Sequence, residues 1–319
     1  MREFELIDGF FSALGARRDD VILGVGDDAA IIAPDTQASV VCTDTLVAGV
    51  HFESKDAGGD VGFKSLAVNL SDLAAMGAEP VWATVNLTIP GFDEIWIRDF
   101  CAGLNDLALR YGVAIVGGDT TRGPLTITVQ AGGRVPVDQA LSRSGARPGQ
   151  RVYLSGPIGD GALGLKVAQG DHRPRADDAS YLLSRLRRPE PAIDAGRALR
   201  GVATSAIDIS DGLLADLGHV LRLSGGYGAE LVVSSSWFSS PVCRYVEAGG
   251  DIGVLISGGD DYVLACTVDE ADAGLFARRG SKDALPWVEI GRVVTEPGIR
   301  VRDPRGRLVD ITVQGYQHF

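Results

Sequence analysis

Cysteine and long apolar runs are both scarce in this chain, and each scarcity excludes a class of protein. Only 4 of the 319 residues are cysteine, and no two of them form a CxxC pair, so the sequence signals neither a zinc site nor a redox dithiol. No run of about 18 apolar residues occurs, so no segment is expected to span a membrane. The first residues lack the apolar core of a secretory signal. We therefore expect a reduced, cytoplasmic setting.

Positive charge is also in short supply. The 30 Lys and Arg residues face 42 Asp and Glu residues, which leaves a net charge of −12. A nonspecific nucleic-acid binder needs the opposite sign, so no nucleic-acid partner is expected. Asp outnumbers Glu by 31 to 11. Short Asp side chains suit metal sites at strand ends, but codon bias would give the same counts, and composition leaves both explanations open.

The sequence does contain an alternation of helix and strand patterns along two lengths of chain. Its 319 residues correspond to about two domains. Amphipathic and strand-like segments alternate through residue 137 and again after residue 150. The polar stretch 142–150, with Gly and Pro, is the predicted linker. We predict a two-domain α/β (α+β) protein with domains at residues 1–140 and 150–319.

Individual patterns predict the main elements. Helices are expected over residues 62–78, 93–111 and 211–223. Two further helices, both rich in Arg, are expected around residues 177–200. Strands are expected over residues 21–33, 39–50, 81–90, 114–119, 125–135, 151–156, 204–210, 251–257 and 262–268. A hairpin is expected near residues 303–306.

The familiar phosphate-binding loops are absent or false. The only Lys-Ser pair, Lys64-Ser65, follows Phe63 and not Gly, so there is no P-loop. Residues 24–29 read GVGDDA and match the dinucleotide pattern GxGxxA. However, Asp27 and Asp28 would stand where a pyrophosphate must approach. Carboxylates beside phosphates are favourable only with a cation between them.

Aspartates recur at six places, and five of these follow an apolar run at its expected end. These residues are Asp27, Asp28, Asp44, Asp72, Asp119, Asp208, Asp211, Asp260 and Asp261. In open α/β sheets such ends bind ligands. Singly, Asp211 would also serve as a helix N-cap, and Asp119 or Asp260 as a turn residue. Neither a cap nor a turn explains Asp72, because it lies inside a predicted helix, where an unpaired carboxylate among apolar residues is costly.

An acidic cradle of this kind predicts a particular chemistry. Mg²⁺ prefers carboxylate oxygens and water, and it commonly bridges to substrate phosphates. The four histidines are far apart in sequence, so no zinc cluster competes. Phosphoryl transfer needs charge neutralisation and positioning more than a covalent group. The residues therefore indicate Mg²⁺-dependent phosphoryl transfer without a P-loop and without a covalent nucleophile.

At these residues the chain resembles the thiamine-monophosphate kinase family. This family belongs to the superfamily that also contains aminoimidazole ribonucleotide synthetase and selenophosphate synthetase. The resemblance covers nearly the whole chain. The matching segments are GVGDDAA (24–30), TDTLVAGVHF (43–52), KSLAVNLSDLAAMGAEP (64–80), GGDTTRGPL (117–125), LSRSGARPG (141–149), SAIDISDGL (205–213), SGGDDY (257–262) and GYQHF (315–319).

The resemblance implies a reaction and a fold. ATP and thiamine monophosphate would give ADP and thiamine diphosphate by direct transfer with several Mg²⁺ ions. It implies a mixed-sheet N-terminal domain, which binds ATP and Mg²⁺ and forms a homodimer with its copy. It also implies a C-terminal α/β domain that closes over nucleotide and substrate. Two alternatives remain: another ATP-dependent synthetase of the superfamily, and a catalytically silent nucleotide or thiamine-phosphate binding protein.

The resemblance also implies roles for single residues. The implied metal ligands are Asp28, Cys42, Thr43, Asp44, Asp72, Asp119, Asp208 and Asp211. The implied ATP contacts are Tyr111, Gly118, Asp119, Arg143 and Ser210. The implied substrate contacts are His51, Asp260 and Tyr316. Without such roles, Tyr111 would be a core aromatic residue, Arg143 a solvated linker charge, His51 a loop residue and Tyr316 a tail residue packed on the core. One departure stands out, because Asp260 occupies a position where the family has Glu.

Overall fold

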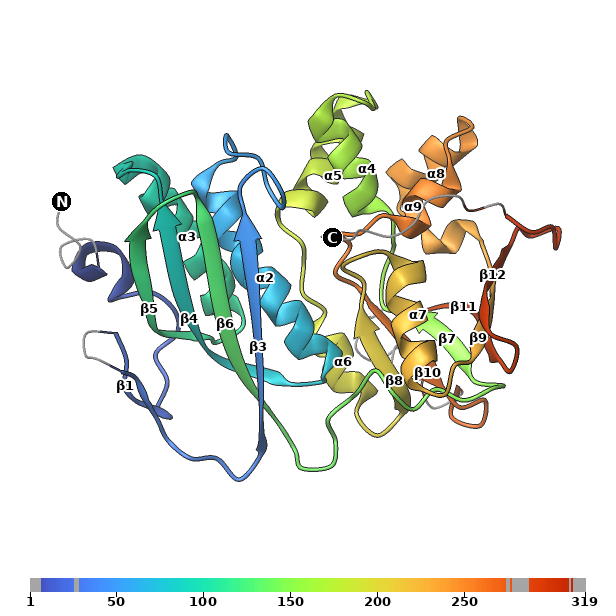
Figure 1. The fold of residues 1–319 in the computed structure, drawn as a ribbon, viewed down its shortest axis with the longest axis horizontal. Coiled ribbons are helices and arrows are strands. Elements are labelled where there is room, and N and C mark those ends of the chain that lie inside the picture. Colours follow the sequence, from blue (N-terminus) through green and yellow to red (C-terminus); the bar gives the residue numbers. More distant parts are fainter. Residues whose placement is uncertain (1–6, 26–28, 274–275, 277–286, 310, 312–319) are drawn as a thin grey trace. The chain divides into compact units, whose positions relative to one another are not determined.

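The computed structural model describes residues 7–25, 29–273, 276, 287–309 and 311, and it divides into two compact units (Figure 1). The first unit contains residues 1–73 and 78–138, and the second contains residues 74–77 and 139–319. No helix in the described part of the chain combines the length and apolar character needed to cross a membrane.

A four-stranded mixed sheet forms the centre of the first unit. Its strand order is β3 (Ala38–Val47), β6 (Thr126–Val135), β4 (Glu79–Ile89) and β5 (Ala114–Arg122). The strand β6 is antiparallel to both β3 and β4, whereas β4 and β5 are parallel. The strands β3, β4 and β5 therefore run in one direction, and their carboxyl ends meet at the same edge of the sheet.

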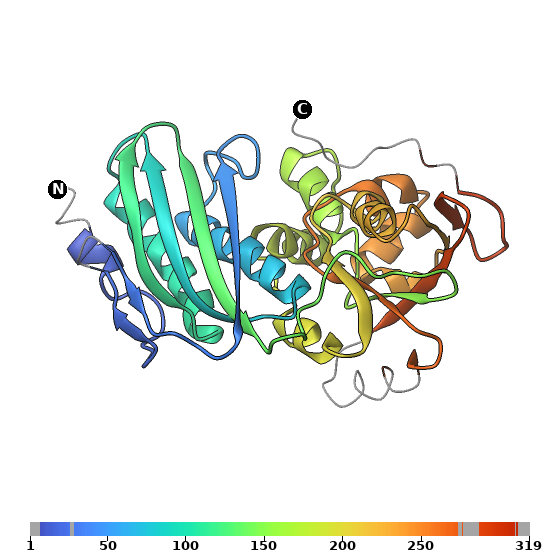
Figure 2. The same cartoon turned by 60° about the horizontal axis from the view of Figure 1, so that its bottom comes forward.

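Two helices, α2 (Gly58–Ala75) and α3 (Glu94–Arg110), cover one face of this sheet (Figures 1 and 2). The predicted helix over 93–111 is confirmed, because Asp93 accepts hydrogen bonds from the N–H groups of Ile95 and Trp96 at 3.0 and 3.1 Å. The two helices touch backbone to backbone. A Cβ added at Gly62 would lie 2.0 Å from the carbonyl oxygen of Phe100, so only glycine fits there.

Smaller elements complete the first unit. A π-helical turn, η1 (Ile7–Phe11), contacts α3. The predicted strand over 21–33 is two short antiparallel strands, β1 (Val21–Leu23) and β2 (Ile31–Ile32).

A six-stranded sheet forms the centre of the second unit. Its strand order is β12 (Gly298–Arg302), β9 (Gly228–Val232), β11 (Val288–Val294), β7 (Arg151–Leu154), β10 (Leu264–Val268) and β8 (Ala203–Asp208). Helix α7 (Leu213–Leu223) packs against it, and fully buried residues such as Leu217, Leu231 and Trp237 lie in its core. The other helices among the described residues of this unit are α4 (Asp160–Gln169), α5 (Ala176–Arg187), α6 (Ile193–Leu199), η2 (Ser235–Trp237), α8 (Ser240–Glu247) and α9 (Ile252–Ser257).

The strand predicted over 251–257 is wrong, because these residues form helix α9. Asp251 starts it by accepting a hydrogen bond from the N–H of Gly253 at 2.8 Å. Leu255 and Ile256 are then fully buried. A short apolar run fits a buried helix as well as a strand, and tertiary packing decided between them. The predicted hairpin near 303–306 is confirmed, because Arg302 and Leu308 form an antiparallel bridge and the Gly306 N–H donates to the Asp303 carbonyl at 2.9 Å.

Candidate functional site

The site residues predicted from the sequence fall into two groups, one in each unit. The first unit holds Cys42, Thr43, Asp44, His51, Asp72, Tyr111, Gly118 and Asp119. The second unit holds Arg143, Asp208, Ser210, Asp211 and Asp260. Asp28 and Tyr316 lie outside the described residues.

In the first unit, the buried side chain of Asn69, a residue of helix α2, is hydrogen-bonded to the backbone of Asp44. The Asn69 side-chain oxygen accepts the Asp44 N–H at 3.1 Å, and the Cys42 Sγ lies 3.3 Å from the Asn69 carbonyl oxygen. Asp72 follows Asn69 by three residues, so both side chains leave the same face of α2. Asp44 and Asp72 are both half-buried. The structure therefore brings these two predicted ligands to one strand–helix contact.

Thr43 and Asp119 belong to the opposite face of the same sheet. Side chains alternate along a strand, and Thr43 is exposed where Cys42 and Asp44 are not. Asp119 pairs with Asn86, which pairs with Thr128, which pairs with Thr45. Directly paired residues share a face, so Asp119 lies in the row of Thr45. The sheet thus separates Asp119 and Thr43 from Asp44.

The expectation that Asp44 and Asp119 follow their strands is wrong, because both lie inside them. Strand β3 continues to Val47 and β5 continues to Arg122. The end of β3 lies within the strand predicted over 39–50, whereas β5 extends three residues beyond the strand predicted over 114–119. Gly118 packs against β4 so closely that a Cβ there would lie 1.9 Å from the carbonyl oxygen of Val85. Both aspartates nevertheless occupy the carboxyl halves of parallel-running strands.

His51 is held in its loop by two hydrogen bonds. Its Nδ1 accepts the N–H of Val47 at 3.0 Å, and its carbonyl accepts a bond from the Lys64 ammonium at 3.3 Å. Lys64 is only 3% exposed, so its ammonium group contacts this loop from the interior of the unit. The loop just after β3 therefore presents a half-buried imidazole in a fixed orientation.

Tyr111 stands apart from the other predicted nucleotide contacts. It follows the last residue of α3, where its N–H donates to the Leu107 carbonyl at 3.2 Å. Asp119 lies five residues beyond the start of β5, a distance of about 16 Å along an extended strand. Tyr111 therefore precedes the start of β5, whereas Asp119 lies in the carboxyl half of this strand.

In the second unit, the turn after β8 gathers three carboxylates. Asp208 is the last residue of β8 and is 3% exposed. The N–H groups of Ser210 and Asp211 both donate to the Asp216 Oδ2 at 3.0 Å. Burial raises the pKa of Asp216 to about 7, and the charges of Asp208 and Asp211 add to this increase. Gly212, not Asp211, is the N-cap of α7.

Asp260 lies against this turn. Its N–H donates to the Ser210 carbonyl at 2.9 Å, and its Oδ1 accepts the Tyr262 hydroxyl at 3.1 Å. Arg143 is exposed in a segment beside β8, where the carbonyl of Ser142 accepts the N–H of Ala206 at 2.9 Å. The second unit thus brings Asp208, Ser210, Asp211 and Asp260 together at one end of β8.

The two groups suit a hard cation by their chemistry. Every charged side chain that is predicted as a metal ligand in these groups is a carboxylate, the ligand that Mg²⁺ prefers. The raised pKa of Asp216 reflects in part the repulsion from Asp208 and Asp211, which a cation would relieve. No group of three or more His, Cys, Asp or Glu side chains within the described ranges is itself close enough to hold a metal ion.

Three polar residues that support the site were not predicted from the sequence: Asn69, Lys64 and Asp216. Their roles depend on contacts between distant segments. Asp216 alone carried a local signal, because an acidic residue in the first turn of a helix can accept backbone N–H groups.

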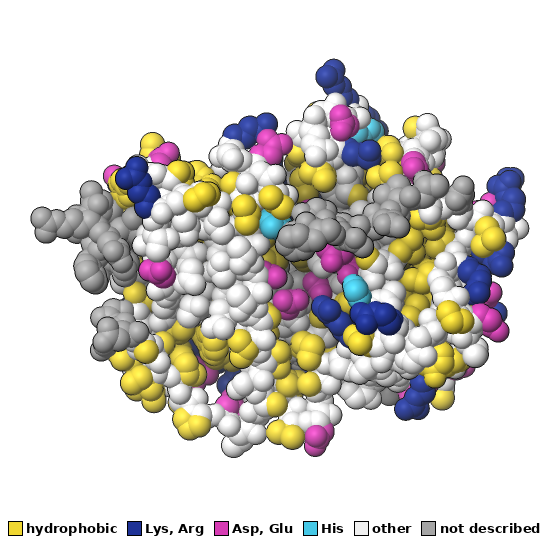
Figure 3. Space-filling model, viewed as in Figure 1, with side chains coloured by type: hydrophobic (Ala, Val, Ile, Leu, Met, Phe, Trp, Pro, Cys, Tyr) yellow, Lys and Arg dark blue, Asp and Glu magenta, His cyan; other side chains and the backbone are white. Residues whose placement is uncertain are grey.

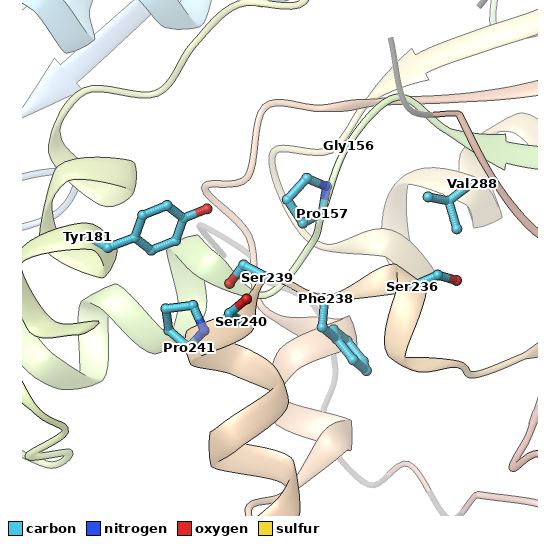
Figure 4. A pocket seen from close by; sticks show the side chains of 9 residues that line it. All are labelled: Gly156, Pro157, Tyr181, Ser236, Phe238, Ser239, Ser240, Pro241 and Val288. Atoms are coloured by element: carbon cyan, nitrogen blue, oxygen red, sulfur yellow. The ribbon is translucent and has the colours of Figure 1, made fainter. Parts of the chain in front are cut away.

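A cavity of about 490 Å³ lies elsewhere in the second unit (Figure 4). Tyr181 of α5, Phe238 and the start of α8 line it, and none of the predicted site residues does. On the face drawn in Figure 3, the Lys and Arg side chains of the described residues stand in small separate groups and form no continuous basic patch. The face therefore gives no support to nucleic-acid binding.

Comparison with known proteins places the whole chain in one family. The model of the AIR synthase related protein N-terminal domain matches residues 26–135, and that of its C-terminal domain matches residues 147–304. The chain is 44% identical to the thiamine-monophosphate kinase of Escherichia coli strain K12, over 99% of this chain and 98% of that protein.

Solved structures agree with this match. The crystal structure of the thiamine-monophosphate kinase from Stenotrophomonas maltophilia K279a is 39% identical with a TM-score of 0.84, over 92% of this chain and 93% of that one. The structure of AaThiL complexed with AMPPCP and TMP is 29% identical with a TM-score of 0.78, over 100% of this chain and 99% of that one. The chain belongs to the thiamine-monophosphate kinase family, within the AIR synthase related proteins.

Proposed function

We propose that this protein transfers the γ-phosphate of ATP to thiamine monophosphate and releases thiamine diphosphate and ADP. The observation that carries this proposal is the full-length 44% identity to a thiamine-monophosphate kinase. The AaThiL complex with AMPPCP and TMP supports it, because AMPPCP is an ATP analogue and the chain matches that protein from end to end.

Mg²⁺ is proposed as the metal, with Asp28, Asp44, Asp72, Asp119, Asp208 and Asp211 as its carboxylate ligands. Thr43 would add an oxygen, and Cys42 would contribute through its backbone carbonyl. When bound, the ions would neutralise the phosphate charges that oppose attack by one phosphate on another. The local support is the carboxylate pair Asp44 and Asp72 in one unit and the crowded carboxylates after β8 in the other.

The chain's own residues would bind and orient the substrates. Gly118, Asp119, Ser210 and Arg143 are proposed to hold ATP, with Arg143 as a bidentate phosphate clamp. Tyr111 is a weaker nucleotide contact. The proposed contacts to thiamine monophosphate are His51, Asp260 and Tyr316. The proposal needs no covalent nucleophile, because the terminal oxygen of the acceptor phosphate attacks directly.

The domains, assembly and location follow the same proposal. The N-terminal domain, 1–140, would bind ATP and Mg²⁺ and pair with a second copy, and the C-terminal domain, 150–319, would close over the ligands. We place the enzyme in the cytoplasm, because its four cysteines are far apart in sequence and include no CxxC pair, which fits a reducing compartment.

A product assay tests the proposal. Purified protein is incubated with thiamine monophosphate, ATP and Mg²⁺, with and without a chelator, and the products are separated by chromatography. We expect equal amounts of thiamine diphosphate and ADP, and neither product when the chelator is present.

Each other outcome contradicts a stated part. ADP without thiamine diphosphate indicates another acceptor within the superfamily. Neither product, with ATP still bound, indicates a silent binding protein. Products that persist with the chelator exclude the proposed role of Mg²⁺.

A further inference from the structure

Asp261 is a buried carboxylate to which the proposed reaction assigns no role. It is 2% exposed. Its Oδ2 accepts the N–H of Gly159 at 2.7 Å and its Oδ1 accepts the N–H of Gly161 at 2.9 Å. Helix α4 begins at Asp160, and its own N-cap residue, Gly159, supplies no side-chain cap. Asp261 therefore caps α4 from a loop about 100 residues further along the chain.

The loop that carries Asp261 has an uncommon backbone. Asp260 and Tyr262, on either side of Asp261, have φ angles of +67° and +53°. Left-handed angles are unfavourable for residues other than glycine and persist only where the surroundings enforce them. Two backbone bonds hold the loop to the turn after β8: Asp260 donates to Ser210 and Tyr262 donates to Ile209, at 2.9 and 2.8 Å.

Three segments meet here with their backbones in contact. A Cβ added at Gly161 would lie 2.5 Å from the Gly259 carbonyl oxygen, and one added at Gly259 would lie 1.9 Å from the Ser210 carbonyl oxygen. Glycine is therefore required at both positions. Asp261 stands between the two left-handed positions, and its side chain joins the loop to α4 through two hydrogen bonds.

We propose that Asp261 is a positioning residue, which locks the 257–262 loop onto the start of α4 and thereby sets the orientation of the Asp260 carboxylate toward the substrate. This inference rests on the proposed function, in which Asp260 contacts thiamine monophosphate. Asp260 is one methylene shorter than the Glu usual in the family, so its reach depends more closely on where the backbone places it.

Two substitutions at Asp261 test the proposal in graded fashion. Asp261→Asn keeps one acceptor oxygen but turns an NH₂ group toward the second backbone N–H, so one of the two bonds is lost. Asp261→Ala loses both. We expect Asp261→Asn to raise the KM for thiamine monophosphate about tenfold, and Asp261→Ala to raise it further. The KM for ATP should change by less than about twofold.

Asp160→Asn is the matched control. Asp160 is equally buried, at 1% exposure, and it starts the same helix. Its carboxylate accepts hydrogen bonds from Tyr181 and Ser239, and none from the 257–262 loop. This variant should lose stability in urea with both KM values unchanged. If Asp160→Asn raises the KM for thiamine monophosphate as much as Asp261→Asn does, Asp261 acts only through stability and the proposal fails.

Hydrogen exchange gives a readout that does not depend on catalysis. Peptides containing residues 157–163 and 257–263 should exchange faster in Asp261→Ala than in the wild type or in Asp160→Asn. Unchanged exchange, or an equal rise in both KM values, overturns the proposal. A wild type that makes no thiamine diphosphate refutes the proposed function instead, and exchange alone then decides whether Asp261 locks the loop.

Discussion

The carboxylate of Asp72 is the residue on which the metal proposal depends most directly. It is half-buried in the middle of α2, and Leu70, Leu73 and Ala74 next to it are fully buried. A carboxylate in such surroundings is unfavourable unless it meets a partner. On the same face, Asn69 already ties α2 to the backbone of Asp44. Asp44 and Asp72 thus bring two carboxylates to one strand–helix contact, and carboxylate oxygens are the ligands that Mg²⁺ prefers.

We therefore expect Asp72→Asn to lower kcat by at least about 100-fold, because one charge that stabilises the transferred phosphate is lost. The side-chain shape is kept, so the fold should survive. The measurement is turnover over a Mg²⁺ titration, with circular dichroism as the check on folding.

Asp106→Asn is the control for this change, since Asp106 is an exposed partner of Arg110 on α3. Its turnover should equal that of the wild type. Wild-type turnover in Asp72→Asn, over the same range of Mg²⁺, would remove Asp72 from the site.

For single residues, the sequence predicts which residue types form the site better than it predicts the direction in which their side chains point. The pattern marked Asp44 and Asp119 as residues at the ends of apolar runs, but both lie inside strands, and strand register places them on opposite faces of one sheet. A shift of one residue reverses a side chain in a strand, and strand ends cannot be located that closely from one sequence. Asp216 and Asp261 matter through bonds made only after folding.

Among the elements, the pairing of α5 with α8 offers a test by pH. Asp178 of α5 is 7% exposed and accepts hydrogen bonds from the Arg244 guanidinium of α8, one of them at 2.9 Å. The bond to Arg244 holds the pKa of Asp178 below its ordinary value of 3.8, with further contributions from Arg175. The ionised carboxylate thus fastens one helix to another.

A lowered pKa fixes the sign of the pH dependence. Stability from the Asp178 charge is fully present above the ordinary pKa and is lost as pH falls through the lowered folded value. We expect Asp178→Asn to lower the urea midpoint at about pH 7, and the difference from wild type to shrink as the pH falls below 3.8. The measurement is urea unfolding at a series of pH values.

The exposed pair of Arg98 and Glu94 provides the comparison, because both side chains are more than half exposed. Glu94→Gln should leave the midpoint nearly unchanged. A midpoint difference for Asp178→Asn that does not shrink at any pH below 3.8 at which the protein stays folded would mean that its charge contributes nothing and that packing explains the loss.

The elements themselves were predictable where one face is apolar over several turns. Helix α3 begins within one residue of its predicted start and buries Phe100, Leu104 and Leu107 as its spacing requires. Helix α9 was mistaken for a strand because six residues carry too little periodicity. Strands β9 and β11 and helices α4 and α8 were not predicted, because their hydrophobic patterns are short and interrupted by glycine or serine.

For the molecule as a whole, the free face of the first unit's sheet is the feature that most concerns assembly. Helices α2 and α3 cover one face, and no helix of this unit's described residues lies on the other (Figures 1 and 2). That open face carries Val41, which is 55% exposed, and the ring of Trp82, which lies over Gly132. Threonines continue the row, with Thr45 and Thr128 hydrogen-bonded at 2.9 Å. A face of this kind suits a second copy of the same sheet, because a two-fold axis would pair each patch with itself.

We therefore expect sedimentation equilibrium to give twice the 33.5 kDa mass of one chain. Val41→Asp should shift the protein to the mass of one chain, because it places a charge within the paired face. Leu109→Asp is the matched control. Leu109 is 56% exposed on α3, so it lies in the same unit but away from the open face, and the variant should remain a dimer.

A wild type with the mass of one chain would exclude the homodimer. A dimeric Val41→Asp protein would keep the homodimer but move its interface to another surface, because a buried, unpaired carboxylate at the centre of a sheet pairing would be too costly to persist.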